Sequence, residues 1–215
     1  MRRHDLIFVK PDAWRALLKN RDDLAAESLV ADWAARGWPL VARRPVPGEP
    51  AGVPLGLPLP PSAGKRRIGF VISHEDVVSV TPPVALSDAR SFAPGGWAAS
   101  LDKLAALSSQ HSVEVRVFGS LAWRTLTGLD YVTAKSDLDF LLYVGGATDL
   151  RALTAGIAVI ETTAPMKLDG EIIREDGAAA NWRDLHLNPK EVLVKTTDGV
   201  ALMPIERFLV SQVTP

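Results

Sequence analysis

One continuous stretch, residues 113–143, constrains the fold more than any other part of this chain. It reads VEVRVFGSLAWRTLTGLDYVTAKSDLDFLLY. The pattern predicts a strand over Val113–Val117, a tight Gly-Ser turn, a short helix, a loop and a second strand that carries Asp137 and Asp139. With the elements expected further along the chain, this order predicts an α+β (or α/β) domain built on a small mixed sheet with flanking helices.

The second strand has two carboxylates two residues apart. Strand side chains alternate between faces, so Asp137 and Asp139 are expected to point the same way. Their neighbours, such as Leu138 and Phe140, are apolar and suit a buried sheet. Two carboxylates in such surroundings repel each other and lose hydration, and a divalent cation offsets both costs. The pair therefore predicts a Mg²⁺ site formed with substrate phosphates, and the alternative is a solvated pair on an edge strand.

The Gly-Ser turn supplies the other half of the predicted site. Gly119 allows the backbone to approach a phosphate closely, and the helix after it presents free N–H groups to an anion. Ser120 can donate its hydroxyl to the phosphate or cap the helix. A phosphate-binding turn beside a metal-binding Asp-x-Asp strand indicates transfer of a nucleotidyl or phosphoryl group.

These motifs resemble the nucleotidyltransferase superfamily, whose pattern is a Gly-Ser turn, a short helix, an Asp-x-Asp strand and a third carboxylate on a later strand. The resemblance assigns the third carboxylate to Asp169, as catalytic base or metal ligand, with Glu171 as the alternative. A β-bulge at Gly170 with two surface acids is the non-functional interpretation. The resemblance also implies phosphate contacts for Lys195 and Lys135, although a lone strand lysine is commonly a surface residue.

A narrower resemblance covers most of the chain. The strings HDLIFV, RVFGSLAW, TGLDYVTAKSDLDFLL, KLDGEII and EVLVKT are similar to the phosphoribosyl-dephospho-CoA transferases of the malonate decarboxylase system. This resemblance implies transfer of phosphoribosyl-dephospho-CoA from triphosphoribosyl-dephospho-CoA to a serine of the apo acyl-carrier subunit, with Mg²⁺ as cofactor and pyrophosphate as leaving group. Within the family string at the start of the chain, His4 and Asp5 are candidates for substrate binding, although a fold role is favoured.

Composition restricts the alternatives. The chain has 215 residues, is 47% hydrophobic and has a formal net charge of −1, which argues for a globular protein and against a broad nucleic-acid surface. It has no cysteine, no signal-peptide pattern and no apolar run of membrane-spanning length, so we expect a cytoplasmic protein without membrane contact. A basic patch for an acidic carrier is a guess that rests on Arg43, Arg44 and Lys65–Arg67.

We expect two domains, a smaller N-terminal α/β region over residues 1–83 that serves substrate or partner, and a catalytic domain over residues 84–215. Expected strands are Leu6–Val9, Leu40–Arg43, Ile68–Ser73, Met166–Arg174 and a hairpin over Glu191–Pro204 with Asp198-Gly199 in its turn; expected helices are Asp22–Arg36, Ser100–Ser109, Thr148–Thr162 and Ala178–Leu185. The Pro- and Gly-rich segment Pro45–Pro61 is expected to be an irregular surface loop.

Two other functions remain open from sequence. One is a nucleotidyltransferase with another acceptor, such as a protein or small molecule that receives AMP, since the same residues would serve it. The other is a non-catalytic scaffold that docks the carrier. Retention of Gly119, Ser120 and both strand acids speaks against the scaffold.

Overall fold

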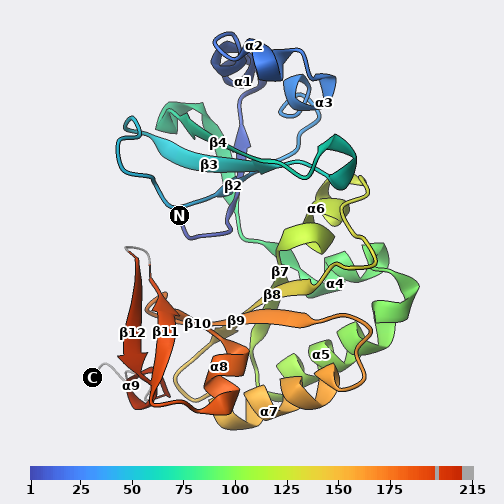
Figure 1. Cartoon of the computed structure of the whole chain (residues 1–215), viewed down its shortest axis with the longest axis vertical. Coiled ribbons are helices and arrows are strands. Elements are labelled where there is room, and N and C mark those ends of the chain that lie inside the picture. The colour runs from blue at the N-terminus through green and yellow to red at the C-terminus, as the bar shows by residue number, and fades with distance from the viewer. Residues whose placement is uncertain (197–198, 210–215) are drawn as a thin grey trace. The chain divides into compact units, whose positions relative to one another are not determined.

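The computed structural model describes residues 1–196 and 199–209 and divides them into two units (Figure 1). Unit 1 comprises residues 1–83 together with 126–130, and unit 2 comprises residues 84–125 and those from 131 onward. Each unit has its own sheet. Helices together with one antiparallel and one mixed sheet confirm the expected α+β class.

The sheet of unit 1 is antiparallel and has the strand order β4-β3-β2-β1-β5. Its strands are β1 (Leu6–Val9), β2 (Leu40–Ala42), β3 (Val53–Pro58), β4 (Arg67–Ile72) and β5 (Val77–Thr81). The short 3₁₀ turns η1 (Pro61–Ala63) and η2 (His74–Asp76) precede β4 and β5. The strands expected at Leu6–Val9, Leu40–Arg43 and Ile68–Ser73 are thereby confirmed to within one residue at each end.

The prediction of an irregular loop over Pro45–Pro61 is wrong, because β3 lies inside the sheet between β4 and β2. Its apolar side chains alternate, with Val53, Leu55 and Leu57 buried. The carbonyl of Pro54 accepts from the N–H of Arg43 at 3.1 Å, so Pro54 faces β2 rather than β4. Proline has no N–H to donate. At Pro54 and Pro58 that donor would point beyond the two ends of β2, which is only three residues long. Proline is tolerated here because its partner strand is short.

The single helix expected over Asp22–Arg36 is also wrong. The segment has two short helices, α2 (Asp22–Ala25) and α3 (Ser28–Ala31), and a further helix, α1 (Pro11–Leu18), precedes it. Pro11 begins a helix rather than only ending β1, because its missing N–H is not needed at the first helical position. The buried indole N–H groups of Trp14 and Trp33 donate to backbone carbonyls of Val30 and Pro39 at 2.8 and 2.9 Å. The first bond joins α1 to α3, and the second joins Trp33, after α3, to the residue before β2.

The sheet of unit 2 is mixed, with the strand order β12-β11-β10-β9-β8-β7-β6. Its strands are β6 (Val84–Ala85), β7 (Glu114–Val117), β8 (Leu138–Val144), β9 (Leu168–Arg174), β10 (Ala179–Asn181), β11 (Glu191–Lys195) and β12 (Val200–Pro204). The pair β8–β9 is parallel, and the other neighbours are antiparallel. The long crossover that a parallel pair requires contains α7 (Leu150–Glu161).

Helices α5 (Ala98–Gln110), α7 and α8 (Trp182–Leu187) lie along one side of this sheet (Figure 1). Asp149 caps α7 by accepting from the N–H groups of Arg151 and Ala152, both at 3.0 Å. The remaining helices are α4 (Leu86–Ala89), α6 (Gly119–Thr127) and α9 (Ile205–Leu209), with 3₁₀ turns η3 (Arg90–Phe92) and η4 (Gly95–Trp97). The helices expected at Ser100–Ser109 and Thr148–Thr162 correspond to α5 and α7.

The helix expected at Ala178–Leu185 begins later than predicted. Residues Ala179–Asn181 form β10, which hydrogen-bonds to both β9 and β11, and α8 starts only at Trp182. Sheet pairing therefore overrides the helix preference of three consecutive alanines. The hairpin of β11 and β12 is confirmed, whereas Asp198 of its expected turn lies outside the described residues. Among residues 1–196 and 199–209, no helix has the length and hydrophobicity needed to cross a membrane.

Candidate active site

The candidate site is built on the parallel strands β8 and β9. Asp139 and Asp169 are direct register partners, so their side chains leave the same face of the sheet. Both are half-buried, whereas the flanking residues Leu138, Phe140 and Leu168 are fully buried. The apolar alternation therefore presents two carboxylates side by side on one face.

The start of α6 lies against the carboxylate of Asp139. The N–H of Phe118 donates to the backbone carbonyl of Asp139 at 3.1 Å, which joins the end of β7 to β8. Gly119, the first residue of α6, has φ of +66°, and a Cβ there would lie 1.9 Å from Oδ2 of Asp139. Only glycine tolerates both this positive φ and the lack of space for a Cβ. Asp139 is thus brought next to the free N–H groups of the first turn of α6.

Asp137 precedes β8 rather than lying within it, because the strand begins at Leu138. The hydrogen bond from Arg183 to Glu161 raises the pKa of Arg183, and the negative charges of Asp169 and Asp137 raise it further. Both aspartates therefore lie within electrostatic reach of one guanidinium, at the end of the sheet where β8 and β9 begin.

Asp169 has a partner that the sequence did not reveal. Nδ2 of Asn181 donates to Oδ1 of Asp169 at 3.1 Å, and Oδ1 of Asn181 accepts the N–H of Arg183 at 2.9 Å. Asn181 is the N-cap of α8. An Asn before a helix is a recognisable capping signal, but nothing in the local sequence points to a residue twelve positions earlier.

Glu171 and Lys195, the other two candidates in this region, are engaged with each other. Nζ of Lys195 lies 2.6 Å from Oε1 of Glu171, whose side chain is 8% exposed. The alternative interpretation of a β-bulge at Gly170 is wrong, since the register with β8 is continuous from Leu168 to Arg174. A Cβ at Gly170 would lie 2.3 Å from the ring of Phe140, so this glycine serves close packing of β8 and β9.

Ser120 and Lys135 differ in their placement. Ser120 is the second residue of α6, which is inside the helix and not at the capping position before it. Lys135 is exposed in the loop before β8, where its N–H donates to Oγ1 of Thr133 at 3.3 Å. The phosphate role of Lys135 stays a prediction.

The described residues contain no group of three or more His, Cys, Asp or Glu side chains arranged to hold a metal ion. A site for Mg²⁺ does not need such a group, because this ion commonly takes one or two carboxylates together with substrate phosphates. Asp137 and Asp139 offer the hard oxygen donors that such coordination uses, and Asp139 lies against Gly119 at the start of α6.

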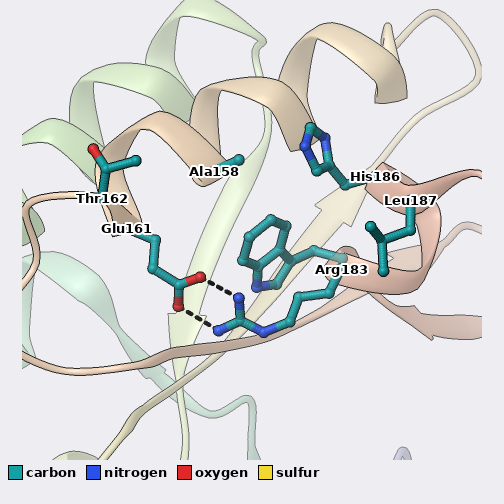
Figure 2. A pocket seen from close by; sticks show the side chains of 7 residues that line it. Ala158, Glu161, Thr162, Arg183, His186 and Leu187 are labelled. Carbon is teal, nitrogen blue, oxygen red and sulfur yellow. Dashed lines mark hydrogen bonds and ion pairs between the residues drawn. The ribbon is translucent and has the colours of Figure 1, made fainter.

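A pocket of about 320 Å³ lies between α7 and α8 (Figure 2). Its lining comprises Ala158, Glu161, Thr162, Trp182, Arg183, His186 and Leu187. Glu161 and Arg183 form a two-pronged ion pair on its wall, and the guanidinium lies 4.5 Å from the indole centroid of Trp182. This pair lowers the pKa of Glu161 because the carboxylate form accepts those hydrogen bonds.

The N-terminal candidates belong to unit 1. Asp5 is buried and accepts the N–H of Arg2 at 2.6 Å, which agrees with the favoured fold role. The basic patch that we guessed is not supported at Arg43. This guanidinium pairs with Glu49 and donates to the carbonyls of Arg44, Leu55 and Phe70, so it stabilises the sheet instead of facing a partner. Arg66 pairs with Glu27.

Comparisons with known proteins identify the family of this chain. Residues 85–206 match the model of the phosphoribosyl-dephospho-CoA transferase MdcG C-terminal domain, and residues 2–83 match that of the MdcG N-terminal domain. The chain belongs to the phosphoribosyl-dephospho-CoA transferase family. As a member of this family it is a transferase enzyme.

Curated relatives extend over nearly the whole chain. A phosphoribosyl-dephospho-CoA transferase of Bradyrhizobium diazoefficiens is 52% identical over 207 residues, which cover 96% of this chain and 92% of the relative. A protein of the same name from Xanthomonas campestris is 37% identical, with 94% and 93% covered. One from Xanthomonas euvesicatoria is 35% identical, with the same coverage. No solved structure matches the chain.

Proposed function

We propose that this enzyme transfers phosphoribosyl-dephospho-CoA from triphosphoribosyl-dephospho-CoA to a serine of the apo acyl-carrier subunit of malonate decarboxylase. Membership of the family supports phosphoribosyl-dephospho-CoA as the group that is transferred. The observation that carries the chemistry is the register pairing of Asp139 with Asp169 on β8 and β9, beside the first turn of α6 at Gly119. The family resemblance supplies the acceptor.

The proposed reaction is a substitution at phosphorus. The serine Oγ attacks the phosphorus nearest the ribose, a phosphodiester bond forms, and the bond to pyrophosphate breaks. Asp169 orients the serine hydroxyl and accepts its proton. The free N–H groups at the start of α6, with the Ser120 hydroxyl, bind the pyrophosphate that leaves.

Asp137 and Asp139 would hold Mg²⁺ in this proposal. When bound, the ion would neutralise negative charge that develops on the phosphates. Glu171 is the weaker candidate for the third carboxylate, because it is buried and paired with Lys195. That ion pair also makes a structural role for Lys195 better supported than a phosphate contact.

A transfer assay tests the proposal. The full chain, Mg²⁺, triphosphoribosyl-dephospho-CoA and the apo carrier subunit are mixed, and the mass of the carrier is measured. We expect a mass gain equal to the prosthetic group, and no gain with Asp137→Ala or Asp139→Ala. If the carrier gains no mass while the enzyme consumes ATP with another acceptor, the donor and acceptor proposed here are wrong. If the protein also fails to bind Mg²⁺, a docking scaffold becomes the better account.

A further inference from the structure

Three consecutive residues at the start of α8 hold the strand segment that carries Asp169. Asn181 donates to the carboxylate of Asp169 at 3.1 Å. The indole of Trp182 and the guanidinium of Arg183 both donate to the carbonyl of Leu168, at 2.7 and 3.0 Å. The segment Asn181–Arg183 therefore contacts both the side chain of Asp169 and the peptide group before it.

The same peptide segment is also held from the other side. The N–H of Leu168 donates to Oε1 of Glu161 at 2.8 Å, and Glu161 is ion-paired with Arg183 (Figure 2). Both backbone groups of Leu168 thus have partners from helices, and Leu168 itself is fully buried. This arrangement fixes the backbone at Leu168 and leaves Asn181 to set the direction of the Asp169 carboxylate.

We propose that Asn181 is a positioning residue, which orients the carboxylate of Asp169 toward the acceptor hydroxyl. This inference rests on the function proposed above, in which Asp169 receives the proton. Oδ1 of Asp169 accepts from Asn181, so Oδ2 is the oxygen that is oriented for the serine. Asn suits both duties, because its amide group donates to Asp169 while its carbonyl oxygen caps α8.

The two duties of Asn181 can be separated by substitution. Asn181→Ser and Asn181→Asp keep an oxygen that caps α8, but neither places an amide donor on Asp169. We expect kcat for carrier modification to fall about 10- to 100-fold in both, with the KM for the donor changed less than about twofold. Asn181→Asp should be the slower variant, because it sets a second carboxylate against Asp169.

A matched control removes a helix cap without contacting Asp169. Asp149→Ala removes the N-cap of α7, so the melting temperature should fall while kcat stays at the wild-type value. If Asp149→Ala lowers kcat as far as the Asn181 variants do, the Asn181 effect is one of stability and the inference is overturned. Wild-type kcat in both Asn181 variants would overturn it as well.

Asp169→Asn, measured in the same assay, separates this inference from the proposed function. If Asp169→Asn is inactive while the Asn181 variants are fully active, Asp169 keeps its role and only the positioning by Asn181 fails. If Asp169→Asn turns over at the wild-type rate, the role of Asp169 fails and the positioning inference fails with it. Loss of activity in Asp169→Asn together with reduced kcat and constant KM in the Asn181 variants supports both.

Discussion

The acids at the start of β8 and the acids on β9 have the same spacing but different surroundings. Asp139 lies against Gly119 at the start of α6, and Asp137 directly precedes β8. On β9, Asp169 accepts a hydrogen bond from Asn181, and Glu171 is paired with Lys195. An Asp-x-Asp or Asp-x-Glu spacing alone does not define a role, because the neighbours decide which carboxylates remain available for chemistry.

The largest effect should come from the β8 acids. Asp139→Asn is expected to lower the transfer rate about a thousandfold or more, because half of the charge that would hold Mg²⁺ is lost. Its melting temperature should stay close to wild type, since asparagine has nearly the size and shape of aspartate. Glu171→Gln is the comparison on β9. Steady-state assays should show that it keeps its transfer rate, and thermal melts should show a lower melting temperature. Equal losses of activity in Asp139→Asn and Glu171→Gln would contradict the different roles of the acids on β8 and β9.

Gly119→Ala should have the next largest effect. A Cβ at this position meets the Asp139 carboxylate, so the carboxylate must move, and a displacement of this size can cost about a hundredfold in rate. Gly128→Ala is the control, because Gly128 has a similar φ of +74° but nothing within 4 Å of an added Cβ. It should lose about 1 kcal/mol of stability through backbone strain and keep its activity. Initial rates and urea melts of both variants provide the measurement.

The buried pair on β9 should affect stability more than catalysis. Lys195→Met leaves the Glu171 carboxylate buried without its ammonium partner, and we expect a loss of about 2 kcal/mol in the free energy of unfolding. The double variant Glu171→Gln/Lys195→Met should recover at least half of this loss. If Lys195→Met instead raises the KM for the donor without destabilising the fold, Lys195 contacts phosphate and the structural interpretation is incorrect.

The smallest effect concerns pH. The hydrogen bonds from Arg183 lower the pKa of Glu161 below its ordinary value of 4.5, so the pair stabilises the folded state above that pH. This contribution is lost as the pH falls through the lowered pKa of the folded state. Glu161→Gln should be about 1 kcal/mol less stable at pH 7, and the difference should narrow below about pH 4. Urea melts from pH 3 to 7 measure it, and a constant difference would refute the assignment.

Much of unit 2 could be predicted from sequence because its patterns are local. The order of β7, α6 and β8 follows from apolar alternation around a Gly-Ser turn. Unit 1 was harder to predict from sequence. Whether Pro54 is tolerated depends on the length of β2, which lies elsewhere in the chain. The helix expected over Asp22–Arg36 was mispredicted because its apolar spacing fits two short helices, α2 and α3, as well as it fits one long helix.

The candidate site likewise contains residues that could be predicted from sequence and residues that could not. Gly119, Asp137, Asp139 and Asp169 belong to motifs that can be found by inspection, and the structure brings Gly119 to Asp139 and Asp139 to Asp169. Alternation puts Asp169 and Glu171 on one face, so the preference for Asp169 rested on the family resemblance. The partners that separate them, Asn181 and Lys195, come from later strands and have no spacing signal.

The parallel pairing of β8 and β9 also has a consequence for how the protein folds. Asp139 and Asp169 are thirty residues apart, and α7 with its connections must close the loop between them before the strands can pair. Closing such a loop costs chain entropy that hairpins such as β11–β12 largely avoid. We therefore expect the two carboxylates to meet late in folding, so that a partly folded chain lacks a functional reaction centre.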